Sequence, residues 1–154
     1  MSNAIEKRLE ELGVTLPTAP APAANYVPYV VTGNQLFISG QLPMTSEGLE
    51  FVGKVGETYT ADEANEAAKL CAINLLSQAK AATGDLSKIK RLVKLVGFVN
   101  STPDFTEQPK VINGASDFMV EVLGENGRHA RSAVSAGALP FGVAVEIEAI
   151  FEIA

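Results

Sequence analysis

Two side chains near the C-terminus offer the plainest chemistry in this sequence. Arg131 lies in residues 129–134, and Glu146 lies in the apolar stretch 143–153. The Gly- and Pro-containing residues 139–142 predict a turn that pairs these stretches antiparallel and brings a guanidinium near a carboxylate. Such a pair can bind an anion and move a proton, or it can be an exposed ion pair worth less than about 1 kcal/mol. The spacing alone leaves both interpretations open.

Residues 143–153 alternate between apolar and acidic side chains, as a half-covered β-strand does. One face carries Val143, Val145, Ile147, Ala149, Phe151 and Ile153, and the other carries Ala144, Glu146, Glu148, Ile150 and Glu152. The first face must be buried. The second is free to meet water, a ligand or another subunit.

Four further residues can be interpreted in two ways. Ser39 and Gly40 end a predicted strand, where the glycine permits a bulge or a close approach to a ligand, but where such residues also simply close a strand. Asn113 lies inside a predicted helix, either exposed or aimed at a site. The single cysteine, Cys71, lies in an alanine-rich helical run, which favours a buried small hydrophobe over a nucleophile.

Composition limits the class of protein. The chain has 154 residues and 47% hydrophobic residues, so we expect one globular domain over 1–154, with an N-terminal part at 1–24 and a core at 25–154. The net charge of −6, without a basic patch, disfavours a nucleic-acid partner. No stretch approaches the roughly 18 apolar residues of a membrane span, and one cysteine cannot form an intrachain disulfide. We therefore expect a cytoplasmic protein with no membrane partner.

The periodicity predicts an α+β fold that positions these residues. A short helix at 5–12 and a Pro/Ala-rich connector at 15–24 precede a hairpin of 26–31 with 35–39 and a weak edge strand at 51–55. A capping box at Thr60 and Glu63 begins a long helix that Gly84 ends. A central strand at 92–99, a helix from about 106 to 123 and the two last strands follow. Two helices cover one face of five or six strands, so the other face, with Val30, Ile38, Val96 and Ile150, should meet copies of the chain.

Taken together, several short motifs resemble the Rid family, also called YjgF or L-PSP endoribonuclease-like proteins. The resemblance covers residues 26–153 and implies a chorismate-mutase-like fold of the bacillus type, assembled as a homotrimer with clefts between subunits. Ala133, where many relatives have cysteine, and the N-terminal helix depart from the shorter relatives, so the chain resembles a longer sub-branch. The motifs are Tyr26, Ser39-Gly40-Gln41-Leu42-Pro43, Asn113, Ala130-Arg131-Ser132 and Glu146-Ile147-Glu148-Ala149.

The resemblance implies hydrolysis of enamines and imines, typified by 2-aminoacrylate, to 2-keto acids and ammonia. In this interpretation Arg131 binds the substrate carboxylate and Glu146 activates water, while Tyr26, Ser39, Gly40 and Asn113 line the substrate site. An imine is already electrophilic, so neither metal nor cofactor is expected. The alternatives are a non-catalytic trimer that binds small carboxylates and, less favoured by the charge, an endoribonuclease or translation inhibitor.

Overall fold

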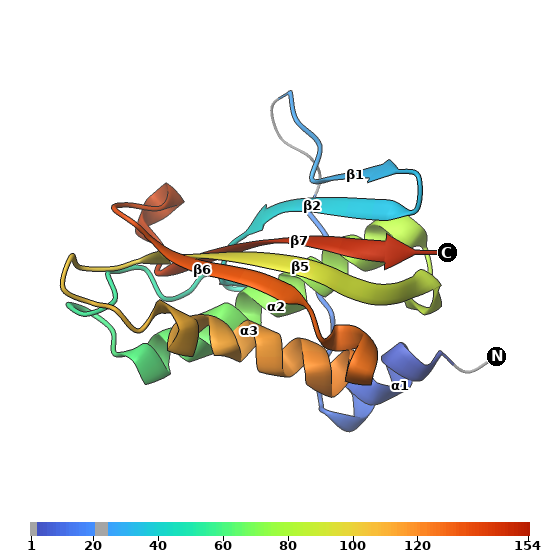
Figure 1. Ribbon diagram of the computed structural model, residues 1–154, viewed down its shortest axis with the longest axis horizontal. Coiled ribbons are helices and arrows are strands. Elements are labelled where there is room, and N and C mark those ends of the chain that lie inside the picture. The colour runs from blue at the N-terminus through green and yellow to red at the C-terminus, as the bar shows by residue number, and fades with distance from the viewer. Residues whose placement is uncertain (1–2, 21–24) are drawn as a thin grey trace.

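The fold is a five-stranded mixed sheet with two long helices on one face (Figure 1). The computed structural model describes residues 3–20 and 25–154. The sheet order is β1-β2-β7-β5-β6. The strands are β1 (Tyr29–Thr32), β2 (Gln35–Gln41), β5 (Ile89–Asn100), β6 (Ala130–Ala136) and β7 (Val145–Ile153). A separate small hairpin pairs β3 (Met44–Thr45) with β4 (Gly48–Leu49).

Local signals in the sequence account for both long helices. In α2 (Ala61–Thr83), Thr60 and Glu63 form the expected capping box, and Gly84 ends the helix in a left-handed conformation at φ 74°. The second long helix is α3 (Gln108–Leu123), with a proline in its first turn. Gly114 of α3 packs so closely on the backbone of Asn65 that a Cβ has no room there. Three short 3₁₀ turns lie at η1 (Leu86–Lys88), η2 (Gly124–Gly127) and η3 (Pro140–Gly142).

The core lies between the sheet and these helices. Strand β7 supplies its odd-numbered residues to this layer, and the predicted apolar face is correct from Val143 to Phe151. Strand β5, apolar on both sides in the sequence, is central as predicted, between β7 and β6. Ala67, Ala68 and Leu75 of α2 are fully buried, which lets the helix lie close to the sheet.

Three predictions about strands are wrong. Strands β6 and β7 do not pair: β6 runs parallel to β5, reached through the α3 crossover, and β5 separates it from β7. The edge strand expected at 51–55 is reduced to isolated bridges, such as Val52 with Val143. Ile38 was assigned to the open face, but it pairs with Ala149 and is 2% exposed in the helix-side core.

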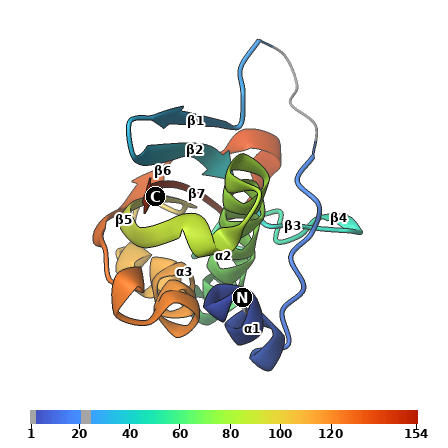
Figure 2. The same ribbon diagram turned by 90° about the vertical axis from the view of Figure 1, so that its right-hand side faces the viewer.

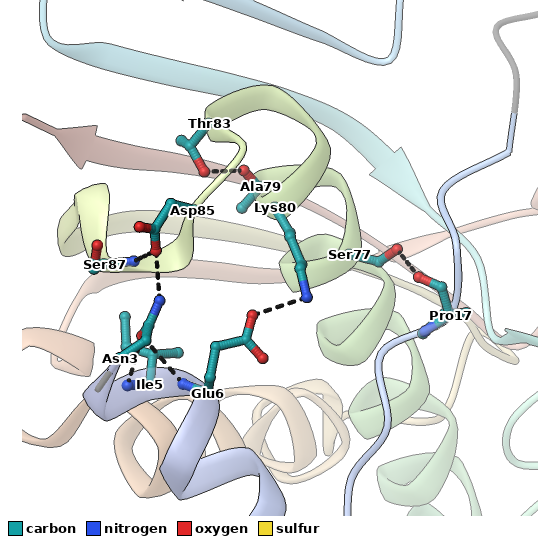
Figure 3. A network of polar contacts seen from close by, with 10 residues as sticks. All are labelled: Asn3, Ile5, Glu6, Pro17, Ser77, Ala79, Lys80, Thr83, Asp85 and Ser87. Atoms are coloured by element: carbon teal, nitrogen blue, oxygen red, sulfur yellow. Dashed lines mark hydrogen bonds and ion pairs between the residues drawn. The ribbon is translucent and has the colours of Figure 1, made fainter. Parts of the chain in front are cut away.

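The N-terminal part is fastened to the core by polar contacts (Figure 3). Helix α1 (Ala4–Glu11) is capped by Asn3, whose amide also donates to Asp85 at 2.6 Å, and Glu6 pairs with Lys80 at 2.9 Å. Residues 15–20 of the predicted connector carry no helix or strand and run alongside α2, where Ser77 donates to the carbonyl of Pro17 (Figures 2 and 3). Residues 21–24 of that connector lie outside the described residues.

The sheet face away from the helices carries a group of apolar residues beside Lys94, Glu146 and Glu148, and no helix of the described residues covers it. Cross-strand partners share a face, so the register gathers apolar residues of all five strands there. Val30, Phe37 and Val134 are 52%, 39% and 45% exposed. The full set is Val30, Phe37, Val96, Phe98, Val134 and Ile150, and we call it the open-face patch.

Candidate functional site

Arg131 is held at the junction of β6 and α3. It pairs with Leu95, which is fully buried on the helix side, so the side chain of Arg131 lies on that side of the edge strand. Nη1 of Arg131 donates to Oδ1 of Asn113 at 2.7 Å and to Oγ of Ser116 at 3.2 Å. Asn113 and Ser116 are three residues apart and therefore face the same way on α3. The structure thus brings together Arg131 and Asn113, and it adds Ser116.

The charge of Arg131 is not neutralised by a carboxylate in the described residues. The ion pairs found in residues 3–20 and 25–154 join Lys80 with Glu6, Lys110 with Asp62 and Arg128 with Glu125. Both acceptors on Nη1 of Arg131 are neutral oxygens. The Nε and Nη2 edge of the guanidinium remains available, and that edge matches a carboxylate in a bidentate pair.

Glu146 lies on the other face of the sheet, beside Gly40. It pairs with Phe98 across β7 and β5, and it is half-buried. The β2–β7 register shifts between Ile38 and Gln41, and the irregular stretch lets the Gly40 backbone approach the Glu146 carboxylate so closely that no Cβ fits between them. Burial raises the pKa of the Glu146 carboxyl, and the neighbouring Glu148 carboxylate raises it further. A carboxylate of raised pKa is a stronger base than an ordinary carboxylate, which suits it to accept a proton.

Tyr26, Ser39 and Gly40 line a single cavity of about 540 Å³. It lies where residues 39–41 of β2 extend beyond Tyr29, the first residue of β1. Its other walls include residues 17–20 of the connector and residues of α2. Ser39 is fixed there by a hydrogen bond to the Pro28 carbonyl at 3.1 Å, while Tyr26 is 62% exposed. Three predicted substrate-binding residues therefore line one hollow, whose walls do not include Glu146, and Gly40 is the one of the three that also approaches the Glu146 carboxylate.

Within one chain, Arg131 and Glu146 do not meet. Glu146 occupies the face opposite to the helices, Arg131 the helix side, and β5 lies between their strands. The interpretation of these two side chains as a cross-strand ion pair is therefore wrong. The predicted residues form two separate groups, which we call the arginine half-site (Asn113, Arg131) and the glutamate half-site (Tyr26, Ser39, Gly40, Glu146).

Cys71 takes no part in either half-site. It is fully buried in α2, and its thiol lies 3.7 Å from the carbonyl of Val145. Burial raises the pKa of the Cys71 thiol well above its usual value, and the Glu146 carboxylate acts in the same direction. A buried neutral thiol is a poor nucleophile, in agreement with its interpretation as a core residue.

Two residues around Arg131 were not predicted from the sequence. Ser116 accepts from its guanidinium, and His129 contacts Ser116 at 2.9 Å. The only signal for Ser116 was its three-residue spacing from Asn113, which has meaning once β6 is known to lie next to α3.

Within residues 3–20 and 25–154, no three His, Cys, Asp or Glu side chains are grouped as a metal site would require. No helix in these residues has the length and apolar character needed to cross a bilayer.

The sequence that folds in this way matches one family model over almost the whole chain. The family model described as "YjgF/chorismate mutase-like, putative endoribonuclease" matches residues 6–151. The chain therefore belongs to the YjgF family, also called the Rid family, and has its chorismate-mutase-like fold.

Individual relatives agree with this assignment. Protein TCP17 of Trypanosoma cruzi is 51% identical over 153 residues, which cover 99% of this chain and 96% of that protein. The crystal structure of protein Atu1372, of unknown function, from Agrobacterium tumefaciens is 56% identical with a TM-score of 0.92, covering 98% of this chain and 93% of that one. RidA from the Antarctic bacterium Psychrobacter is 30% identical with a TM-score of 0.62, covering 88% and 94%.

Proposed function

We propose that the protein is a hydrolytic deaminase that converts enamine or imine intermediates of the 2-aminoacrylate type into 2-keto acids and ammonia. The observation that carries this proposal is the presence of two complementary groups. One half-site holds a guanidinium that has no carboxylate partner among the described residues, and the other holds a partly desolvated carboxyl. A small substrate with one carboxylate and one imine carbon requires both.

The proposal places the reaction in clefts between copies of the chain, most simply in a homotrimer. In one chain the half-sites lie on opposite faces of the sheet, so only a neighbouring copy can supply the missing half. The open-face patch supports such an assembly, because an apolar surface of this kind is costly to leave in water. Cyclic symmetry then produces one identical cleft at each interface.

The proposed mechanism assigns a role to each half-site. Arg131 binds the substrate carboxylate through its free Nε and Nη2 edge, and Asn113 holds the guanidinium in place. The enamine becomes the imine by taking a proton from solvent on carbon and losing one from nitrogen to solvent, and water then adds to the imine carbon. Glu146 accepts a proton from that water and returns one to nitrogen. The resulting carbinolamine collapses to the ketone and releases ammonia, so the net reaction consumes one water. Tyr26, Ser39 and Gly40 wall the space that the substrate occupies.

A coupled assay with freshly generated 2-aminoacrylate tests this function. Wild-type protein should accelerate pyruvate formation, and Arg131→Ala and Glu146→Gln should each lower the rate by about 100-fold or more. Arg131→Lys serves as the matched control, since it keeps the charge but loses the planar fork, and it should also be impaired. If wild type and all three variants leave the decay of 2-aminoacrylate unchanged, the protein is not this enzyme.

The same variants separate the enzyme from a non-catalytic binder of small carboxylates. A binder would retain pyruvate in Glu146→Gln, lose it in Arg131→Ala, and show no turnover in any form. The description of the family model as a putative endoribonuclease suggests a third activity, for which the net charge of −6 is unfavourable. Absence of salt-sensitive RNA binding would exclude it.

A further inference from the structure

His129 lies two residues before Arg131, just ahead of β6, and is half-buried. Its two ring nitrogens contact different partners: Nδ1 lies 2.6 Å from the carbonyl oxygen of Gly127, and Nε2 lies 2.9 Å from Oγ of Ser116. Gly127 is buried, and it packs on the backbone of Met119 too closely for a Cβ. The carbonyl that orients the ring is therefore fixed by packing between η2 and α3.

The direction of each hydrogen bond follows from the chemistry of the groups. A carbonyl oxygen can only accept, so Nδ1 of His129 carries the proton, and in the neutral ring Nε2 has a free lone pair. The hydroxyl of Ser116 then donates to Nε2. Its oxygen is left to accept from Nη1 of Arg131, at 3.2 Å. The chain of donors thus runs from Arg131 to Ser116 to His129, and from His129 to Gly127.

The surroundings of His129 keep its ring neutral, so that Nε2 accepts a hydrogen bond from Ser116. Burial lowers the pKa of His129, the Gly127 contact opposes this effect, and the positive charge of Arg131 lowers the pKa further. Among the other charged residues of the adjoining elements, Arg128 is engaged by Glu125 at 3.3 Å and exposed, and none adds to the shift. The ring is therefore neutral at pH 7 and offers Ser116 an acceptor.

We propose that His129, acting through Ser116, is a positioning residue that orients Arg131 for carboxylate binding. The proposal rests on the proposed function, in which Arg131 binds the substrate carboxylate. Ser116 and Asn113 together occupy both protons of Nη1, so the guanidinium cannot rotate without losing a bond. Its Nε and Nη2 edge is then presented in one fixed plane, which saves the entropy cost of ordering it on binding.

Two substitutions of His129 separate its two nitrogens. In His129→Gln, the side-chain oxygen reaches the position of Nε2 and can accept from Ser116. In His129→Asn, the shorter side chain can donate to Gly127 but leaves Ser116 without its acceptor. If His129 only filled space, the position of the acceptor atom in the two variants would make no difference to binding.

Pyruvate, the expected product, is the probe for calorimetric binding to the full chain. His129→Gln should bind within about twofold of wild type. Ser116→Ala, which removes one acceptor from the charged guanidinium, and His129→Asn, which leaves the Ser116 hydroxyl without its acceptor, should each bind about tenfold more weakly. The double variant Ser116→Ala/His129→Asn should be no weaker than Ser116→Ala, because His129 acts through Ser116. Wild-type affinity in His129→Asn, or equal weakening in both His129 variants at unchanged melting temperature, would overturn the proposal.

A measurement without ligand keeps this test independent of the proposed function. Long-range ¹H–¹⁵N spectra should place the proton of His129 on Nδ1, and the Arg131 side-chain resonance should move in His129→Asn but not in His129→Gln. A proton on Nε2 would reverse the chain of donors and refute the positioning role. Failure of the proposed function differs: wild-type protein would then leave the decay of 2-aminoacrylate unchanged, whatever the tautomer of His129.

Discussion

Gly40→Ala should remove activity while leaving the fold intact. The backbone of Gly40 does not have a positive φ, so alanine adopts it without strain. Its Cβ, however, would stand 2.8 Å from Cδ and 2.9 Å from Cγ of Glu146, where carbon atoms normally stay about 3.5–4.0 Å apart. The obstacle is the end of a flexible side chain, so Glu146 moves and the strand does not.

The size of the effect follows from that movement. The nearest Glu146 atom, Oε2, would lie closer still to the new Cβ, so the carboxylate must retreat by more than about 1 Å to restore normal contact. A catalytic group misplaced by about 1 Å can cost about 100-fold in rate. This factor corresponds to about 2.7 kcal/mol of activation free energy. In the 2-aminoacrylate assay, kcat should therefore fall by about two orders of magnitude, with a melting temperature close to that of wild type.

Two further variants sharpen this test. Gly137→Ala meets no atom within 4 Å and has no positive φ, so it should change neither rate nor stability. Gly40→Ala/Glu146→Gln should be no slower than Glu146→Gln alone, because both changes act on one carboxyl. If Gly40→Ala keeps the wild-type kcat, the position of Glu146 next to β2 does not matter for the reaction and the argument fails.

Three other outcomes are expected. Burial and the Glu148 carboxylate raise the pKa of Glu146, so the folded protein loses stability as pH rises through that pKa and Glu146 ionises. Glu146→Gln should therefore have a higher melting temperature than wild type at pH 8 and the same melting temperature in acid. A pH-independent difference would contradict this. Gly114→Ala forces a Cβ onto the backbone of Asn65 and should cost about 1–3 kcal/mol in urea unfolding. Ile150→Lys puts a charge in the open-face patch and should yield monomers without activity in light scattering; an intact, active oligomer would refute the assembly.

Features encoded within one element were predictable from the sequence. The capping box at Thr60 and the alternation along β7 depend on neighbours a few residues away, so local physics determines them. The central place of β5 followed from its apolar character on both faces. The family resemblance then supplied the fold that joins these elements.

Long-range pairing was not predictable in the same way. The turn at η3 is real, with Phe141 at φ 59°, but it connects two strands that have β5 between them. Turn residues predict that the chain reverses direction, but they do not predict which strand the following segment pairs with. The parallel partner of β6 is set by α3, whose crossover carries the chain back along the sheet. The same error made Arg131 and Glu146 look like close neighbours.

The distribution of Arg131 and Glu146 on opposite sides of one sheet implies that two inactive proteins can repair each other. If every cleft takes its cation from one copy and its acid from the next, a mixture of refolded Arg131→Ala and Glu146→Gln chains contains some clefts with both groups intact. Random assortment in equal amounts would restore about one cleft in four. Such complementation would make each protomer half of an enzyme, with neither half able to work alone.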